Sequence, residues 1–93
     1  MPSGSPAAPV RVDEKIASQL AVRGWTEQEI REVVNRPAIG TSTDNTSGRR
    51  DPATVYGSRS GGYAVVNDRT GRVIQISDRT DPGWVPDSRI TWK

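Results

Sequence analysis

The glycine at position 24 limits the fold of this 93-residue chain more than any other single residue. In residues 12–23, apolar side chains recur at nearly helical intervals, and Arg23 stands where the last turn of a helix favours a cation. A glycine directly after such a stretch commonly takes the left-handed conformation that ends a helix. Thr26 then offers an N-cap, and Glu29 three residues later completes a capping box. The pattern predicts two short helices joined by a sharp corner at the glycine.

Strand signals follow in the second half of the chain, where short runs of β-branched and aromatic residues are separated by turn residues. The turn at 68–71 ends in a glycine, which can take the positive φ of a hairpin. Ile74 and Ile76 are expected on one face of their strand. Residues 40–51 have no apolar side chain and are expected to form a mobile polar loop. Strands are expected at 54–56, 62–67, 72–77 and 90–92.

The order of these elements predicts an α+β fold, with two short N-terminal helices, within residues 12–35, packed on a small antiparallel β-sheet. A chain of this length forms one small domain. Residues 1–10 are rich in Pro, Ser and Ala and are expected to be a flexible leader or linker, which leaves residues 11–93 as the domain. No apolar run reaches the roughly 18 residues that a membrane span needs. We expect a monomer whose domain makes no membrane contact.

The absence of histidine and cysteine restricts the chemistry that the chain can perform. Without cysteine there is no disulfide and no thiolate, and without histidine the commonest general base and transition-metal ligand are missing. A zinc site, a Ser-His-Asp triad and a two-histidine ribonuclease site are therefore excluded. We expect neither a metal ion nor a cofactor.

Arginine dominates the positive charge of the chain. Thirteen basic residues face eleven acidic ones, and eleven of the thirteen are arginine. The guanidinium group binds phosphate with a rigid fork and stacks on bases, which favours a nucleic acid or another anionic partner. A GC-rich coding sequence would also favour arginine over lysine, so composition leaves both explanations open.

Two cations stand eight residues apart in the first predicted helix. Eight residues are slightly more than two helical turns, so Lys15 and Arg23 are expected to point to nearly the same face. The pair can form a phosphate clamp, or it can be an ordinary solvated face. Spacing alone favours the solvated face.

Three further residues are candidates for contact with RNA. Arg49 and Arg50 end the polar segment and can reach a phosphate backbone, although an ordinary exposed loop has the same composition. Trp84 lies in a Pro- and Gly-rich turn, where a stiff backbone can present its ring to a base. The alternative for Trp84 is that it covers a thin core.

The segments KIASQLAVRGWTEQEI, DPATVYGS and VVNDRTGRVIQISDRTDPGWVPDSRITW resemble the ribonuclease domain of the colicin E-five family, from Lys15 to Trp92. The resemblance implies a bacterial toxin domain that cuts tRNA anticodon loops without a metal. Cleavage is expected between wobble guanine or queuosine and the following uridine, in the tRNAs for Tyr, His, Asn and Asp. The implied products carry a 2′,3′-cyclic phosphate and a 5′-hydroxyl.

The resemblance also implies roles for individual residues. Lys15 and Arg23 match the two catalytic positions of the family, and Trp84 and Ile76 match positions that meet the bound dinucleotide. The family has a longer, lysine-rich segment before DPATVYGS, whereas this chain has the short TSTDNTSGRR. Arg49 or Arg50 is expected to replace the missing substrate-binding lysine.

The family resemblance implies tRNA as substrate and an acidic cognate immunity protein as partner. It also implies delivery from a producer cell and action in the cytoplasm of a target bacterium. A second hypothesis remains open on the sequence, in which the domain is a degenerate toxin that binds RNA or immunity protein without cutting. Substitution of Lys15 or Arg23 would then weaken binding, with no chemistry to lose.

Overall fold

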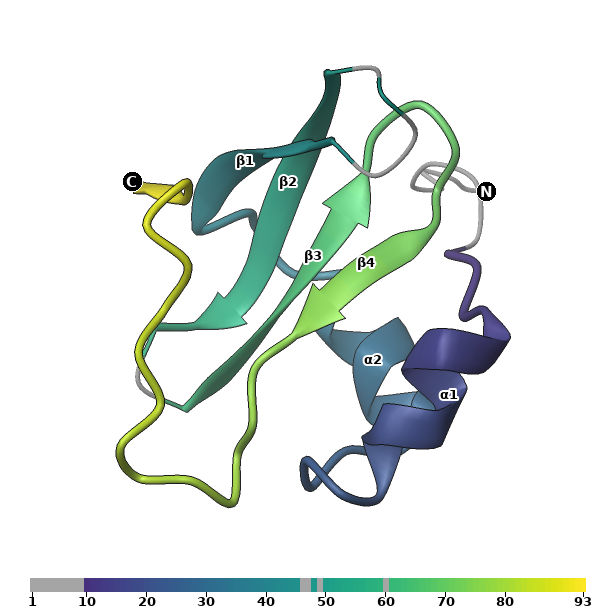
Figure 1. Cartoon of the computed structure of the whole chain (residues 1–93), viewed down its shortest axis with the longest axis vertical. Coiled ribbons are helices and arrows are strands. Elements are labelled where there is room, and N and C mark those ends of the chain that lie inside the picture. Colours follow the sequence, from purple (N-terminus) through teal and green to yellow (C-terminus); the bar gives the residue numbers. More distant parts are fainter. Residues whose placement is uncertain (1–9, 46–47, 49, 60) are drawn as a thin grey trace.

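Five antiparallel strands form one sheet in the order β4-β3-β2-β1-β5, and two helices pack against one of its faces (Figure 1). The computed structural model describes residues 10–45, 48, 50–59 and 61–93. This arrangement confirms the predicted α+β class. The elements are α1 (Glu14–Leu20), α2 (Glu27–Val33), β1 (Gly40–Asp44), β2 (Asp51–Ser58), β3 (Gly62–Asn67), β4 (Val73–Ile76) and β5 (Thr91–Trp92).

The corner at Gly24 is confirmed, but α1 ends earlier than its spacing suggested. The helix stops at Leu20, so Arg23 lies in the following turn rather than in the last turn of the helix. Gly24 has a φ of 80°, and the Trp25 amide donates to the Leu20 carbonyl at 2.8 Å. The Gly24 amide donates to the carbonyl of Ala21, which completes a Schellman pattern. These two bonds therefore give the Leu20 and Ala21 carbonyls, at the end of the helix, hydrogen-bond partners.

The capping box of α2 is also confirmed. The Thr26 hydroxyl accepts from the Glu29 amide, and the Glu29 carboxylate accepts from the Thr26 amide. Ile30 in this helix is fully buried. The Trp25 ring packs in the same apolar cluster, and its indole N–H donates to the Ser77 carbonyl at 2.8 Å. The start of α2 is thereby fixed to the segment that follows β4.

The expected polar loop at 40–51 is wrong for its first half, where β1 forms. This strand pairs with β2 along its whole length and with β5 at Gly40 and Thr41. Its backbone bonds do not require apolar side chains, and threonine suits extended backbone. Asp44 at its end is buried and accepts from the Asn67 side chain at 2.8 Å. Residues 46, 47 and 49 of the expected loop lie outside the described residues.

The sheet has an apolar cluster on each face. The helix-side cluster contains Ile16, Trp25, Ile30, Ala64, Val66, Val73 and Ile76. The opposite cluster contains Ala53, Val55, Tyr63, Val65 and Ile90, with Trp84 and Trp92 packed against it. The second cluster is covered by the segment that follows β4, which passes around one end of the sheet before it reaches β5 (Figure 1). A residue on this segment can therefore meet the corner after α1.

The chain before α1 joins the domain at the β4 edge. Arg11 pairs in parallel with Arg72, and its amide donates to the Gly71 carbonyl at 2.7 Å. The expected leader at 1–10 lies outside the described residues except for its last residue. Within the described ranges, neither helix is long and apolar enough to cross a membrane.

Candidate active site

Arg23 lies where the corner after α1 meets the segment after β4. Its Nη1 donates to the Ile76 carbonyl at 2.8 Å. Its guanidinium carbon lies 5.2 Å from the centroid of the Trp84 ring, within the range of a cation–π contact. Its own carbonyl accepts from the Arg79 amide at 2.9 Å. The side chain and backbone of Arg23 are thus both fixed by residues more than fifty positions later in the chain.

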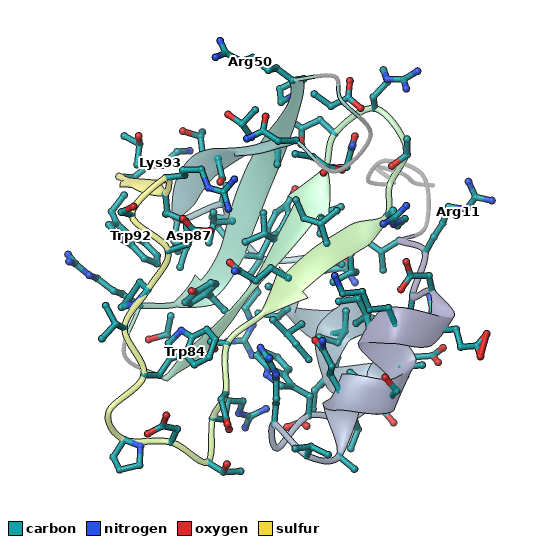
Figure 2. All side chains as sticks on the ribbon, viewed as in Figure 1. Arg11, Arg50, Trp84, Asp87, Trp92 and Lys93 are labelled. Atoms are coloured by element: carbon teal, nitrogen blue, oxygen red, sulfur yellow. The ribbon has the colours of Figure 1, made fainter. Side chains whose placement is uncertain are left out.

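Trp84 contacts Arg23 from the opposite side of the sheet. Arg23, Ile76 and Trp84 together form what we call the Arg23 group. Its ring is half-buried against the second apolar cluster, and its backbone N–H closes a turn on the Asp81 carbonyl. The indole N–H donates to the Tyr63 hydroxyl at 3.1 Å. Figure 2 shows Trp84 near the end of the sheet where the C-terminal segment crosses it. The Trp84 ring therefore covers the second apolar cluster and also contacts the Arg23 guanidinium.

The structure places Ile76 in the group through its backbone. Its side chain is fully buried beneath the helices, so its carbonyl is the part that contacts Arg23. The expectation that Ile74 and Ile76 share a face is wrong. Val73 pairs with Val66 and Gln75 with Val65, so Ile74 is an extra residue in the ladder. This bulge turns Ile74 to the opposite cluster and leaves Ile76 on the helix side.

A carboxylate lies close to the Arg23 guanidinium. Hydrogen bonds from the side chain and the backbone of Thr80 lower the pKa of Asp78, and the positive charge of Arg23 lowers it further. Asp78 is therefore ionised at neutral pH. One N–H of Arg23 is used by the Ile76 carbonyl, and a guanidinium carries five N–H donors. Donors thus remain for an anionic ligand beside the Trp84 ring.

Lys15 lies in the first turn of α1 and is exposed to solvent. Among the described residues it forms no ion pair with a carboxylate. Lys15 stands near the start of α1, and Arg23 lies in the turn after the helix has ended. The predicted pair of catalytic cations remains a prediction.

Arg50, one of the two arginines of the polar segment, is not part of this group. Arg50 is exposed at the start of β2, at the end of the sheet opposite to Trp84 (Figure 2). Arg49 lies outside the described residues. A contact between Arg50 and RNA therefore requires a substrate that reaches well beyond the nucleotide at Trp84.

Sequence reasoning missed two residues that shape the site. Arg79 lies over the Trp25 ring at 4.7 Å and pairs with Glu29 at 3.0 Å, while its amide holds the Arg23 carbonyl. Tyr63 is fully buried, and its hydroxyl holds the Trp84 indole. A tyrosine in a strand and an arginine in a polar turn carry no sequence signal for these roles. Both depend on contacts between residues far apart in the chain.

The described residues include no cluster of three or more carboxylates that could hold a metal ion. The group offers a fixed guanidinium and an aromatic surface beside it, and the exposed Lys15 lies on the helix that leads to the same corner. A guanidinium can stabilise charge that develops on a phosphate, and an aromatic ring can support an unstacked base. This arrangement suits a single-stranded nucleic acid whose phosphate lies next to an exposed base.

Comparisons with known proteins agree with this chemistry. The family model for the colicin E5 ribonuclease domain matches residues 12–89. The chain is 56% identical over 92 residues to Colicin-E5 of Escherichia coli, which covers 89% of this chain and 51% of that protein. It is 54% identical over 92 residues to the tRNA nuclease CdiA of Burkholderia pseudomallei, which covers 90% of this chain and 7% of that protein. The chain thus spans about half the length of one relative and a small part of the other.

The matched residues run from before α1 to the segment before β5, so they include Lys15, Arg23, Ile76 and Trp84. The family match covers more than half of the chain, and the resemblance seen in the sequence is confirmed. This protein belongs to the colicin E5 ribonuclease domain family.

Proposed function

We propose that this chain is a metal-independent endoribonuclease that cuts tRNA anticodon loops between wobble guanine or queuosine and the next uridine. The observation that carries the proposal is the Arg23 guanidinium, held by the Ile76 carbonyl against the Trp84 ring. Family membership supports it, and so does the relative from Burkholderia pseudomallei, which is named a tRNA nuclease. The proposed substrates are the tRNAs for Tyr, His, Asn and Asp.

The proposed reaction is an internal transfer at one phosphate. The ribose 2′-oxygen attacks phosphorus, the bond to the 5′-oxygen of the next nucleotide breaks, and a 2′,3′-cyclic phosphate remains. A base must take the 2′ proton, and an acid must supply a proton to the leaving oxygen. Arg23 stabilises the charge on the phosphorane, and Lys15 takes part in proton transfer.

Trp84 would hold a base next to the phosphate that Arg23 binds. A base stacked on an aromatic side chain gains about 1–3 kcal/mol, and stacking requires that the base has left its own strand's stack. Anticodon bases are single-stranded and accessible in this way. Cleavage in an anticodon loop rather than in a duplex follows from this requirement.

The proposed biological setting is an interbacterial toxin. The domain would be delivered from a producer cell and would act in the cytoplasm of the target bacterium. The producer would need an immunity protein, and an acidic partner that covers the face of Lys15 and Arg23 would block RNA by occupying the same donors. Electrostatic complementarity of this kind favours fast association.

A synthetic anticodon stem-loop with guanosine at the wobble position and uridine after it tests the reaction directly. With EDTA present, we expect one cut between the two nucleotides and a 2′,3′-cyclic phosphate by mass spectrometry. A second stem-loop with 2′-deoxyguanosine at the wobble position should stay intact, because it lacks the nucleophile.

The variants Lys15→Ala and Arg23→Ala should each abolish cutting, whereas Arg36→Ala should cut at the wild-type rate. Arg36 is a suitable control because it is an exposed arginine after α2. A folded wild-type protein that binds the stem-loop and leaves it intact would favour the non-cutting toxin instead.

A further inference from the structure

The hydroxyl of Tyr63 is a buried polar group that holds the C-terminal segment. Tyr63 has no exposed surface, and its N–H donates to the Ser77 hydroxyl at 2.9 Å. Its phenol oxygen accepts from the Trp84 indole N–H at 3.1 Å and from the Asp87 amide at 3.4 Å. One oxygen in β3 thus fixes two points of the segment that crosses the sheet, Trp84 and Asp87, which Figure 2 labels.

The bond to Trp84 defines the orientation of its ring. An indole has one donor, so a partner on that donor fixes the edge of the ring that faces the core. Arg23 contacts the face of the same ring, with its guanidinium carbon 5.2 Å from the ring centroid. If the ring tilts, the cation loses its aromatic contact and keeps only the carbonyl of Ile76.

The ring of Tyr63 has a separate role from its hydroxyl. The ring packs in the second apolar cluster and meets the Trp92 ring edge to face, with centroids 5.5 Å apart. Phenylalanine would keep this packing and lose only the oxygen. The two roles can therefore be separated by one substitution.

We propose that Tyr63 is a positioning residue, whose hydroxyl fixes the Trp84 ring so that a base and the Arg23 guanidinium meet it in one geometry. The proposal rests on the proposed ribonuclease function. Tyr63 touches neither the phosphate nor the base and acts through Trp84. Loss of the hydroxyl should weaken the binding of RNA more than it slows the chemical step, since Trp84 holds the base before and during the reaction.

The test compares Tyr63→Phe with Tyr56→Phe on the anticodon stem-loop. Tyr56 is the matched control because it is a half-buried tyrosine of β2 that packs on the helix-side cluster. We expect Tyr63→Phe to raise KM by about 3- to 10-fold, the equivalent of one hydrogen bond, with a smaller change in kcat. Tyr56→Phe should leave both constants at wild-type values.

Two further measurements separate positioning from a general loss of stability. In a proton–nitrogen NMR spectrum, the indole N–H signal of Trp84 should move in Tyr63→Phe, while that of Trp25, bonded to the Ser77 carbonyl, should stay. In a Trp84→Phe background, which has no indole donor, Tyr63→Phe should cause no further rise in KM. A purely structural role would lower the melting temperature and affect both backgrounds equally.

The outcomes distinguish the positioning role of Tyr63 from the proposed ribonuclease function. If the wild type cuts and Tyr63→Phe cuts with the same KM, the positioning role is wrong and the ribonuclease function stands. If Tyr63→Phe does not fold, Trp84→Phe alone must raise KM, and an unchanged KM there overturns the positioning role. If the folded wild type leaves the stem-loop intact, the proposed function itself fails, and the positioning role fails with it.

Discussion

At the scale of the residue, Arg23 shows how one side chain can be specified by distant parts of the chain. Its spacing from Lys15 is visible in the sequence and favours a solvated helix face. Its partners are the Ile76 carbonyl and the Trp84 ring, which only the folded chain brings to it. The resemblance to a family implies a catalytic role for Arg23, and the contacts in the structure are consistent with the proposed role. The proposed role of Tyr63 could not be inferred from the spacing or the resemblance, because a buried hydroxyl bond leaves no pattern in the sequence.

The substitution Arg23→Lys tests whether the guanidinium fork matters beyond its charge. Lysine keeps the charge but cannot donate to a carbonyl and lie flat on an aromatic ring at the same time. We expect kcat/KM on the anticodon stem-loop to fall by about 100-fold or more, as when a donor to a developing charge is removed. The melting temperature should stay close to that of the wild type. Activity within a few-fold of the wild type would show that charge alone suffices.

At the scale of the element, the local signals predicted the helices and most of the strands well. Capping residues and glycine act through contacts a few residues away, so the corner at Gly24 and the capping box of Thr26 could be inferred from the sequence. Strand β1 could not, because its backbone bonds come from β2 and β5 and its side chains are polar. The bulge at Ile74 was also hidden, since it depends on the register against β3.

Gly24→Ala should damage both the corner and the site. The residue has a φ of 80°, and an added Cβ would lie 3.2 Å from the Thr80 Cγ2 and 3.3 Å from the Arg79 Cβ. Left-handed backbone costs an alanine about 1–2 kcal/mol, which a denaturant titration can measure. Because Arg23 directly precedes the strained residue, activity should fall as well.

Gly71→Ala is the matched control for this substitution. Gly71 has a φ of 73° and lies in the turn between β3 and β4, away from the proposed site. The variant should lose a similar amount of stability from backbone strain and keep its activity. Equal loss of activity in both variants would contradict the link between the corner and Arg23.

The carboxylate of Glu29 makes the start of α2 sensitive to acid. A hydrogen bond from Arg79 is the largest cause that holds the pKa of Glu29 below its ordinary value of 4.5. A group whose pKa is lower in the folded chain stabilises the fold above its ordinary pKa, and this stability is lost as the pH falls through the lowered pKa. The melting temperature should therefore decrease as the pH drops below 4.5.

Glu29→Gln is the variant that isolates this charge. The amide oxygen can still accept from the Thr26 N–H and keep the capping box, while the ion pair with Arg79 is lost. At neutral pH the variant should melt at a lower temperature than the wild type, and its melting temperature should fall less steeply in acid. Parallel acid curves for the two proteins would assign the acid sensitivity to Asp78 or Asp87, whose pKa values are lowered too.

At the scale of the whole molecule, the sheet separates two apolar clusters, and the site forms where the covers of both faces meet. The helices cover one face and are joined by the corner that carries Arg23, while the segment after β4 covers the other face and carries Trp84. The α+β class followed from the order of local signals. The place where Arg23 and Trp84 meet could not be predicted from these signals, because it depends on where the 14-residue connection from β4 to β5 crosses the sheet. Lys15 and Arg50 lie beyond this point, on α1 and at the opposite end of the sheet.

The measurement that tests the central claim most directly is the incubation of the purified protein with total bacterial tRNA in EDTA, with every cut mapped by end-sequencing. The account predicts cuts between wobble guanine or queuosine and uridine in the tRNAs for Tyr, His, Asn and Asp, and none with Arg23→Ala. Cuts at other positions would contradict the proposed specificity and implicate the short segment before β2. Intact tRNA with a folded wild-type protein, or equal cutting by Arg23→Ala, would contradict the account of the site itself.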